Sequence, residues 1–281
     1  MEKINILFIF ILIHFISSDD YQDKWRDYPA CRLGRMQSPI EINEYKSTYS
    51  NDFSFVYQDY KEIKNVNPLK LTYENDNYAF VANFPKRGYI NFERNGVIKQ
   101  YELLRAELYP GLHKINDDSP DYELHLVHIK NLDFKTNKNQ YRRIEDPNMF
   151  LTIVLRYKKC SADNNIVCAS DNGLLKQLKD NFYDHSLGDY PVFQDKRAFL
   201  YEGSSMHIPC DENVNYYVIK DLFYYDDDDD INFDLNFVNI TAMEKYERPV
   251  YKNFMNYKEV SKSNYNYVKI ITFLLIIFIL F

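Results

Sequence analysis

Glycine is scarce in this chain, with 7 glycines among 281 residues, and none of them forms the Gly-rich loop that cradles a phosphate. Nucleotide chemistry is therefore not expected. An excess of positive charge is also lacking, because the formal net charge is −7 at pH 7. An acidic protein gains nothing from counterion release on DNA or RNA, so we expect no nucleic acid partner.

Aromatic residues, in contrast, are abundant. The chain has 26 tyrosines and 20 phenylalanines, and few glycines with many Tyr, Ile and Val favour strands. Short apolar segments recur between polar turns, at residues 69–72, 80–83, 89–92, 101–104, 123–127, 150–157 and 216–222. Asn95-Gly96 predicts a hairpin turn, and the apolar spacing within 174–182 predicts a helix. The segment 123–127 alternates, so Glu123, His125 and Val127 are predicted to share one face of a strand. These signals predict one large β-rich domain over residues 19–256.

The first 18 residues have the pattern of a secretory signal peptide. Glu2 and Lys3 precede an apolar run over residues 4–16, and Ser17-Ser18 follow it. The alternative interpretation of this run is a buried strand or helix. A signal peptide would place the chain in the secretory pathway.

The last segment, residues 270–281, is apolar and carries no charge. As a helix it would be about 18 Å long, shorter than the roughly 30 Å hydrocarbon core of a bilayer. Together with the polar stem over residues 257–269, it predicts a glycolipid (GPI) attachment signal with Ser261 as the attachment residue. A tail anchor is the alternative. Both place the chain on the extracellular face of the plasma membrane, with the membrane as a partner.

Four cysteines in a chain with a signal peptide imply disulfides. Cys160 and Cys168 enclose a short polar stretch, which predicts a disulfide between them that closes a short loop. By sequence alone, three pairings of the four cysteines remain open. Asn239-Ile240-Thr241 is a glycosylation sequon, so Asn239 is a candidate glycosylation site.

Three motifs occur in a recognisable order. They are Gln37-Ser38-Pro39-Ile40-Glu41-Ile42, Glu123-Leu124-His125-Leu126-Val127-His128, and Glu202-Gly203-Ser204 running to Pro209-Cys210. With Trp25 and Arg248-Pro249-Val250, the chain resembles the α-class carbonic anhydrases over about residues 25–251. The resemblance implies a mainly β (α+β) domain with a large central, mostly antiparallel twisted sheet and a few short helices. It also selects the disulfides Cys31–Cys210 and Cys160–Cys168.

The resemblance implies a zinc site held by three histidines, two of them two residues apart on one strand, where they share a face. Alignment places Glu107 and Tyr109 at these two positions, and a slip of one residue would place Ala106 and Leu108 there. Neither alignment supplies a histidine. The third position is His125, which we interpret as vestigial.

Other positions that the resemblance makes functional have changed as well. Met206 stands where the family has the threonine that orients the zinc hydroxide, and a thioether has no proton to donate. Tyr78 stands at the proton-shuttle position, and Leu112 replaces a glutamate. His207 is a candidate zinc ligand that could replace one of the missing histidines. We therefore expect no catalytic residues and no cofactor.

The sequence thus favours a cell-surface carbonic-anhydrase-like protein that has lost its zinc and acts as a binding or adhesion module for a protein or glycan on another cell. The alternative is a zinc-dependent carbonic anhydrase, a lyase hydrating CO2, with an atypical site. The chain also resembles poxvirus carbonic-anhydrase-like envelope proteins, which bind glycosaminoglycans. Four basic residues are the candidate binding site for such a polyanion, and the alternative interpretation is a solvated loop. They are Lys135, Lys138, Arg142 and Arg143.

Overall fold

The computed structural model describes residues 28, 30–31, 34, 36–50, 53–58, 60, 70–74, 77–84, 88–94, 97–131, 149–160, 174–180, 196–206, 210–225 and 251–255. Several sequence predictions lie outside these residues: the signal peptide, Trp25, the basic cluster, Cys168, His207, Asn239, residues 248–250, Ser261 and the C-terminal tail.

Strands rich in β-branched and aromatic residues make up most of the described structure. Among the described residues there is also the short helix α3 (Leu174–Asp180), where the sequence predicted a helix. The strands are β1 (Thr48–Tyr49), β2 (Phe53–Gln58), β3 (Lys70–Glu74), β4 (Asn77–Asn83), β5 (Tyr89–Arg94), β6 (Val97–Pro110), β7 (Tyr122–Lys130), β8 (Phe150–Lys159), β9 (Lys196–Gly203), β10 (Val214–Tyr225) and β11 (Tyr251–Met255).

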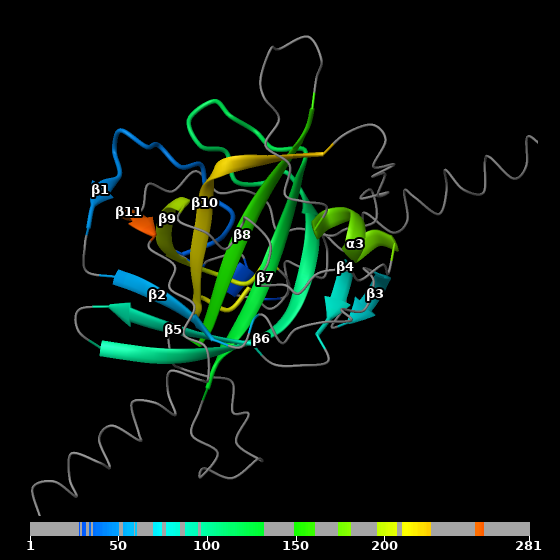
Figure 1. Cartoon of the computed structure of the whole chain (residues 1–281), viewed down its shortest axis with the longest axis horizontal. Coiled ribbons are helices and arrows are strands. Elements are labelled where there is room, and N and C mark those ends of the chain that lie inside the picture. The colour runs from blue at the N-terminus through cyan, green and yellow to red at the C-terminus, as the bar shows by residue number, and fades with distance from the viewer. Residues whose placement is uncertain are drawn as a thin grey trace, which may run out of the picture.

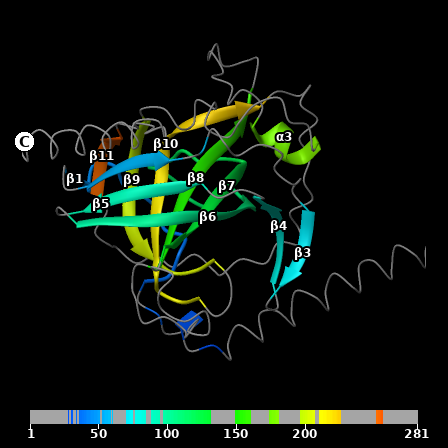
Figure 2. The same cartoon turned by 60° about the horizontal axis from the view of Figure 1, so that its bottom comes forward.

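All of these strands belong to one sheet. Its order is β1-β11-β9-β10-β8-β7-β6-β4-β3, and β2 and β5 extend it from β6. Two neighbouring pairs are parallel, β1 with β11 and β10 with β8, and the other pairs are antiparallel. Figures 1 and 2 show β7, β8 and β10 side by side, with β3 and β4 toward one edge and β1 and β11 toward the other. The predicted large, mostly antiparallel sheet is confirmed.

The predicted hairpin is also confirmed by strand pairing. β5 and β6 run antiparallel, and Arg94 lies opposite Val97, the two residues that flank Asn95-Gly96 in the sequence. No helix within the described residues has the length and hydropathy needed to cross a bilayer.

The two faces of the sheet bury different kinds of residue, because successive side chains of a strand point to opposite faces. On β7, Leu124 and Leu126 point into an apolar core that α3 covers with its leucines. Glu123 and His125 point to the other face, where tyrosines and aliphatic residues form a second core. The candidate site lies on this second face.

His128 lies two residues beyond Leu126, within the first core. Its Nε2 contacts the hydroxyl of Tyr60, and its Nδ1 contacts the carbonyl oxygen of Leu151 at 3.1 Å. Burial lowers the pKa of His128 to about 4, although hydrogen bonds to backbone groups partly oppose this shift. The imidazole therefore stays neutral in the folded protein at neutral pH.

We predict that the folded protein loses stability as the pH falls from about 6.5 to about 4, because over this range the unfolded chain takes up a proton on residue 128 that the folded chain does not. For this one histidine, the free energy of unfolding should fall by about 2 kcal/mol between about pH 7.5 and pH 5. Urea denaturation across this range measures it. The His128→Gln variant should show a flatter pH dependence, and an equally steep one would contradict the assignment.

Candidate functional site

Two neighbouring strands bring the candidate residues together. On β6, Glu107 and Tyr109 are two residues apart and share a face, as do Glu123 and His125 on β7. The pairing of β6 with β7 places Glu107 directly opposite His125, and Tyr109 directly opposite Glu123. Four polar side chains thus meet on the inner face of the sheet, and all four are buried.

Glu123 is the hub of a cluster of hydrogen bonds. One carboxylate oxygen accepts the backbone N–H groups of Leu112, at 3.0 Å, and His113. The other contacts Nδ1 of His113 at 2.7 Å and Nε2 of His125 at 3.0 Å. We call His113, Glu123 and His125 the histidine–glutamate cluster. Its carboxylate is shared between two imidazoles.

The charge state of this cluster follows from its contacts. Burial by itself raises the pKa of Glu123, but the interactions with His113 and His125 outweigh it and hold that pKa well below its usual range. Burial lowers the pKa of His125, so its ring is neutral at neutral pH. Because an ionised carboxylate can only accept hydrogen bonds, Nε2 of His125 carries the hydrogen and Nδ1 keeps the lone pair.

A second set of hydrogen bonds links the cluster to the first and third sequence motifs. Nε2 of His113 contacts the hydroxyl of Tyr201 at 2.6 Å, and that hydroxyl lies 3.3 Å from Oγ of Ser38. Ser38 and Ser204 bind each other through backbone N–H and side-chain oxygen in both directions, at 2.9 and 3.1 Å. A Cβ on Gly203 would lie 2.1 Å from Oγ of Ser38, so glycine is needed for this approach.

Aromatic rings fill the space around the cluster. The ring of Tyr109 lies 4.6 Å from that of His125 between centroids, and Tyr201 stacks on Tyr216 at 5.0 Å. His113 lies 5.6 Å from the Tyr216 ring. Burial raises the pKa of Tyr216 well above its usual value, so this residue stays a neutral phenol.

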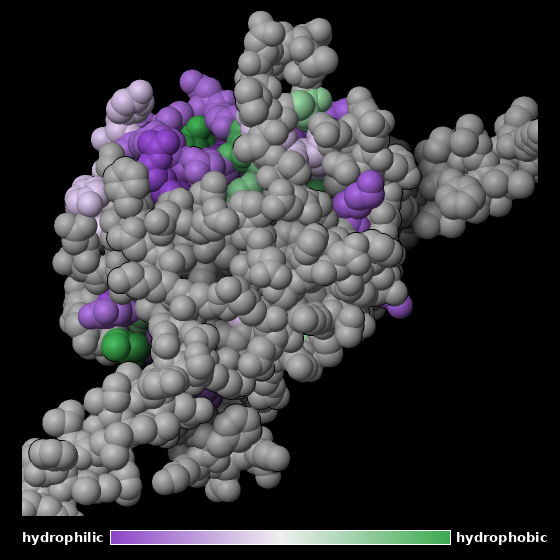
Figure 3. All heavy atoms as spheres, viewed as in Figure 1, coloured by the Kyte–Doolittle hydropathy of each residue, from purple (hydrophilic) through white to green (hydrophobic). Residues whose placement is uncertain are grey.

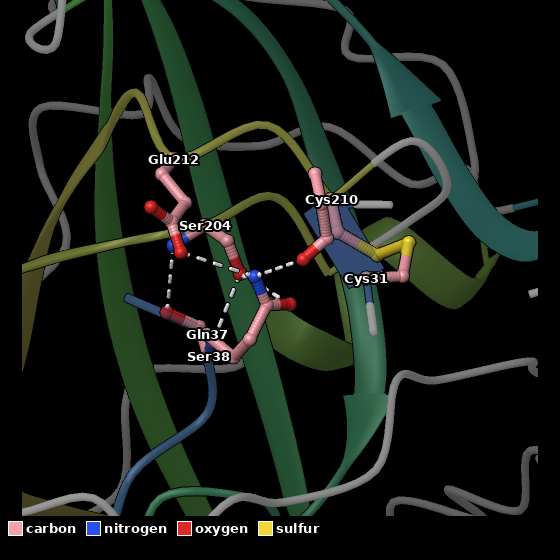
Figure 4. The surroundings of a disulfide bond; sticks show 7 residues. Cys31, Gln37, Ser38, Ser204, Cys210 and Glu212 are labelled. Carbon is pink, nitrogen blue, oxygen red and sulfur yellow. Dashed lines mark hydrogen bonds between the residues drawn. A yellow bond between two sulfur atoms is a disulfide. The ribbon is translucent and has the colours of Figure 1, made fainter. Parts of the chain in front are cut away.

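A disulfide links Cys31, ahead of the first motif, to Cys210 at the end of the third, and Figure 4 shows its surroundings. Cys31 is bonded to Cys210, 179 residues further along the chain, which confirms this predicted pair. Next to it, an oxygen of Glu212 accepts hydrogen bonds from the backbone N–H of Met36 and, at 3.3 Å, from the side-chain amide of Gln37. The disulfide and the hydrogen bonds hold residues 36–38 close to Ser204, Cys210 and Glu212.

Cys160 is also disulfide-bonded. Its predicted partner, Cys168, lies outside the described residues, so the identity of this pair stays a prediction.

The two residues predicted at the first ligand positions bind each other. The hydroxyl of Tyr109 donates to Glu107 at 2.7 Å, and Nε of Arg105 donates to the other oxygen of Glu107 at 2.6 Å. Arg105, Glu107 and Tyr109 therefore form a hydrogen-bonded row on β6, which we call the β6 row. Burial and the nearby Glu107 charge raise the pKa of Tyr109 well above its usual value.

The histidine–glutamate cluster could hold a metal ion by proximity, because one ligand atom from each residue lies within 4.8 Å of the others. However, Glu123 already links the two imidazoles, and both ring nitrogens of His113 have partners. A catalytic zinc takes three protein ligands. Nδ1 of His125 is one suitable donor, but a phenol with a raised pKa and a carboxylate bound by Arg105 are poor ones. The described donors do not fit a three-ligand zinc site without breaking these hydrogen bonds.

The other predicted positions are only partly described. Met206 is buried in the same core as Tyr109 and Tyr216. Leu112 is buried, and its backbone N–H binds Glu123. Tyr78 lies on β4 opposite Tyr73, and nothing further is described of its side chain. His207 lies outside the described residues, so its role stays a prediction.

Sequence reasoning missed the residues that hold the cluster together. Glu123 was recognised only as sharing a face with His125, and Arg105 and Tyr201 received no role. The alternation of β7 did carry a signal for Glu123, because a carboxylate on the buried face of a strand must find donors. Arg105 had a weaker signal, since it lies two residues before Glu107 and therefore on its face.

Comparisons with known proteins agree with this architecture. A family model described as eukaryotic-type carbonic anhydrase matches residues 20–264. Among solved structures, the α-carbonic anhydrase from Thermovibrio ammonificans in complex with the inhibitor sulfanilamide is similar, with a TM-score of 0.51 and 19% sequence identity. The match covers 80% of this chain and 91% of that one, and at this identity it shows the fold alone. No curated protein sequence matches.

Proposed function

Because this chain belongs to the eukaryotic-type carbonic anhydrase family, we propose that it is a cell-surface member that has lost the catalytic zinc and acts as a binding or adhesion module. The observation that carries this proposal is the β6 row. Where the resemblance places two of three zinc ligands, the chain has a glutamate that holds a tyrosine hydroxyl and an arginine.

The electrostatics of the row support the proposal. A divalent cation beside Arg105 would meet a positive charge that is already paired with Glu107 at 2.6 Å. Metal coordination by Glu107 would compete with two hydrogen bonds, one of them charge-assisted. Coordination by Tyr109 would require loss of a proton that burial and Glu107 hold in place. The polar side chains of the β6 row already have hydrogen-bond partners, so we expect the site to be stable without a metal ion.

The compartment follows from the disulfides and from the chain ends. Disulfides form and persist in oxidising environments, which fits an extracellular or secreted protein. Attachment to the plasma membrane rests on the predicted tail, and the partner would be a protein or glycan on another cell. The scaffold alone does not fix function, so the binding role rests on the exported chain and its altered site together.

Zinc content and CO2 hydration by the full-length protein test the proposal. After incubation with excess zinc and desalting, we expect no stoichiometric zinc and a hydration rate no higher than that of buffer. One zinc per chain with hydration activity would overturn the loss of the metal site. The binding role requires a separate assay, in which full-length protein on beads attaches to cultured cells, and absence of attachment across cell types would contradict that role.

The alternative function is a zinc-dependent carbonic anhydrase with an atypical site. One observation favours it: Nδ1 of His125 keeps a lone pair, with Glu107 opposite on the next strand. If zinc is found, the His125→Ala variant decides its location. Loss of the metal in this variant would support the alternative, and retention would place the ion elsewhere in the chain.

A further inference from the structure

The end of β10 lies in the most acidic part of the sequence. Tyr224 and Tyr225 are the last two residues of this strand, and residues 226–230, which follow, are all aspartate. Within five positions on either side of Tyr224 there are five aspartates and one lysine. A run of like charges is by itself usually a solvated segment. The two tyrosines beside the run are the more informative feature.

These two tyrosines have different surroundings, because neighbouring residues of a strand point to opposite faces. Tyr225 is 8% exposed and belongs to the first core. Its ring lies 5.6 Å from that of Tyr122, and its hydroxyl donates to Asp121 at 3.3 Å. Tyr224 points to the other face and is partly exposed. Of the two, Tyr224 is the tyrosine that a modifying enzyme could reach.

Tyr224 also lies close to a strand end. The pairing of β10 with β9 ends at Ile219, and its pairing with β8 continues to Tyr225. In the view of Figure 1 both β8 and β10 end in the upper part of the molecule, and Figure 3 shows hydrophilic surface there in purple. Strand ends open at a lower free energy than strand centres, so an enzyme reaches a residue at this position at little cost.

The neighbouring strand places two basic side chains on the face of Tyr224. Lys158 lies directly opposite Tyr224 in the pairing of β8 with β10, and Arg156 lies opposite Leu222. Because residues two apart in a strand share a face, both basic residues lie on the same face as the Tyr224 phenol. The Lys158 side chain is 41% exposed, whereas Arg156 is fully buried.

The buried charge of Arg156 has incomplete compensation among the described residues. Its guanidinium donates to the carbonyl oxygens of Lys220, at 2.9 Å, and Asp118, at 2.7 Å, but the Asp118 carboxylate lies 3.5 Å away and is 45% exposed. Nε has no hydrogen-bond partner among these residues. Burial lowers the pKa of Arg156, and negative charge on Asp118, Glu123 or Tyr224 opposes this shift. A negative group on Tyr224 would therefore interact favourably with Arg156.

We propose that Tyr224 is a site of tyrosine sulfation. A sulfotransferase forms the bond between the phenol oxygen and the sulfur, the bond from sulfur to a phosphate oxygen of a nucleotide phosphosulfate breaks, and a base of that enzyme takes the phenol proton. The flanking aspartates attract the basic surface of such an enzyme. Lys158 and Arg156 then face the negative charge of the product. The inference rests on the secretory route of the proposed function, because this modification is made in that pathway.

The test is expression of the full-length protein in cultured animal cells supplied with radioactive sulfate. We expect label that glycosidase treatment does not remove, and mass spectrometry should place one sulfo group on Tyr224. The Tyr224→Phe variant should lose this label. Tyr225→Phe and Tyr122→Phe are matched controls that should keep it, because both rings pack against the first core although acidic residues flank each of them.

Three results would overturn the assignment: label that persists in Tyr224→Phe, a phosphoryl group at this position that phosphatase removes, or surface-bound protein whose Tyr224 is unmodified. Chlorate, which blocks sulfation, supplies a second readout. Protein made without chlorate should unfold at no lower urea concentration than protein made with it, and a lower midpoint would contradict the placement of the sulfate beside Lys158 and Arg156.

The location of the protein separates the failure of this inference from failure of the proposed function. Surface-bound protein that attaches to cells but carries no sulfate would contradict the sulfation alone. Protein that stays in the cytosol would overturn both proposals, because neither the cell-surface role nor the modification is then available to the chain.

Discussion

Replacing Glu107 and Tyr109 with histidine should give the chain a zinc site at positions where we expect the wild-type protein to bind no metal. The two positions share the inner face of β6, and residue 107 lies directly opposite His125 on β7. New imidazoles there would lie beside His125, whose Nδ1 is the candidate third nitrogen of a tetrahedral site with one open position. We expect the Glu107→His/Tyr109→His variant to retain one zinc ion per chain after desalting, with none retained by the wild type.

The control for this variant is Glu107→Gln/Tyr109→Phe, which removes the same side chains without adding metal donors. Both variants leave Arg105 without its carboxylate, but this residue is 34% exposed and water can solvate its charge. CO2 hydration should stay low in the histidine variant, because the Met206 thioether has no proton to donate and accepts hydrogen bonds only weakly, so it does not orient a bound hydroxide as a threonine would. Failure to take up zinc in a folded variant would mean that the alignment of β6 is wrong.

Replacing Glu123 with alanine should cause the largest loss of stability among single substitutions in the site. The fully buried carboxylate accepts two backbone N–H groups and one hydrogen from each of two imidazoles. Its removal leaves four buried donors without an acceptor. Because breaking a buried charged network by removing one member costs about 3–5 kcal/mol, we expect a loss of that size in the free energy of unfolding. Urea denaturation at pH 7 measures it.

Glu202→Ala is the matched control for Glu123→Ala. Glu202 pairs with Arg94 at 2.7 Å, but both side chains are partly exposed. Exposed pairs contribute little because water and salt screen them, so we expect a loss of less than about 1 kcal/mol. Glu123→Gln should lie between the two, since one amide oxygen remains as an acceptor while the amide NH2 opposes the donors around it. Similar losses for Glu123→Ala and Glu202→Ala would show that the cluster is not a stabilising hub.

Much of the fold was predictable because its signals are local. The alternation within 123–127 identified a strand on which Glu123 and His125 share a face, and the structure shows that both side chains are buried in β7. Asn95-Gly96 predicted a hairpin, and the strands that precede and follow these residues in the sequence, β5 and β6, pair antiparallel. β9 was not predicted as a strand, because Lys196 and Arg197 open it and no alternation is visible across Ala198-Phe199-Leu200-Tyr201. β9 lies between β10 and β11, and its residues 198–201 are buried.

The candidate site was predictable only in part, for a physical reason. Sequence spacing placed Glu107 with Tyr109 on one face and Glu123 with His125 on another, but it could not show that the two faces adjoin in this register. Register depends on the pairing of β6 with β7 along their whole length. The role of Tyr201 depends on contacts across 88 residues of sequence, from His113 to β9.

The sequence by itself determined the β-rich class, the order of the three motifs, and the lack of histidine at two expected ligand positions, because each is a matter of residue type and spacing along the chain. Only the tertiary structure decided what those positions do instead. Arg105 and Tyr109 satisfy Glu107, and two histidines share the Glu123 carboxylate. A buried polar group must find its partner in space, and folding brings these partners together from different strands.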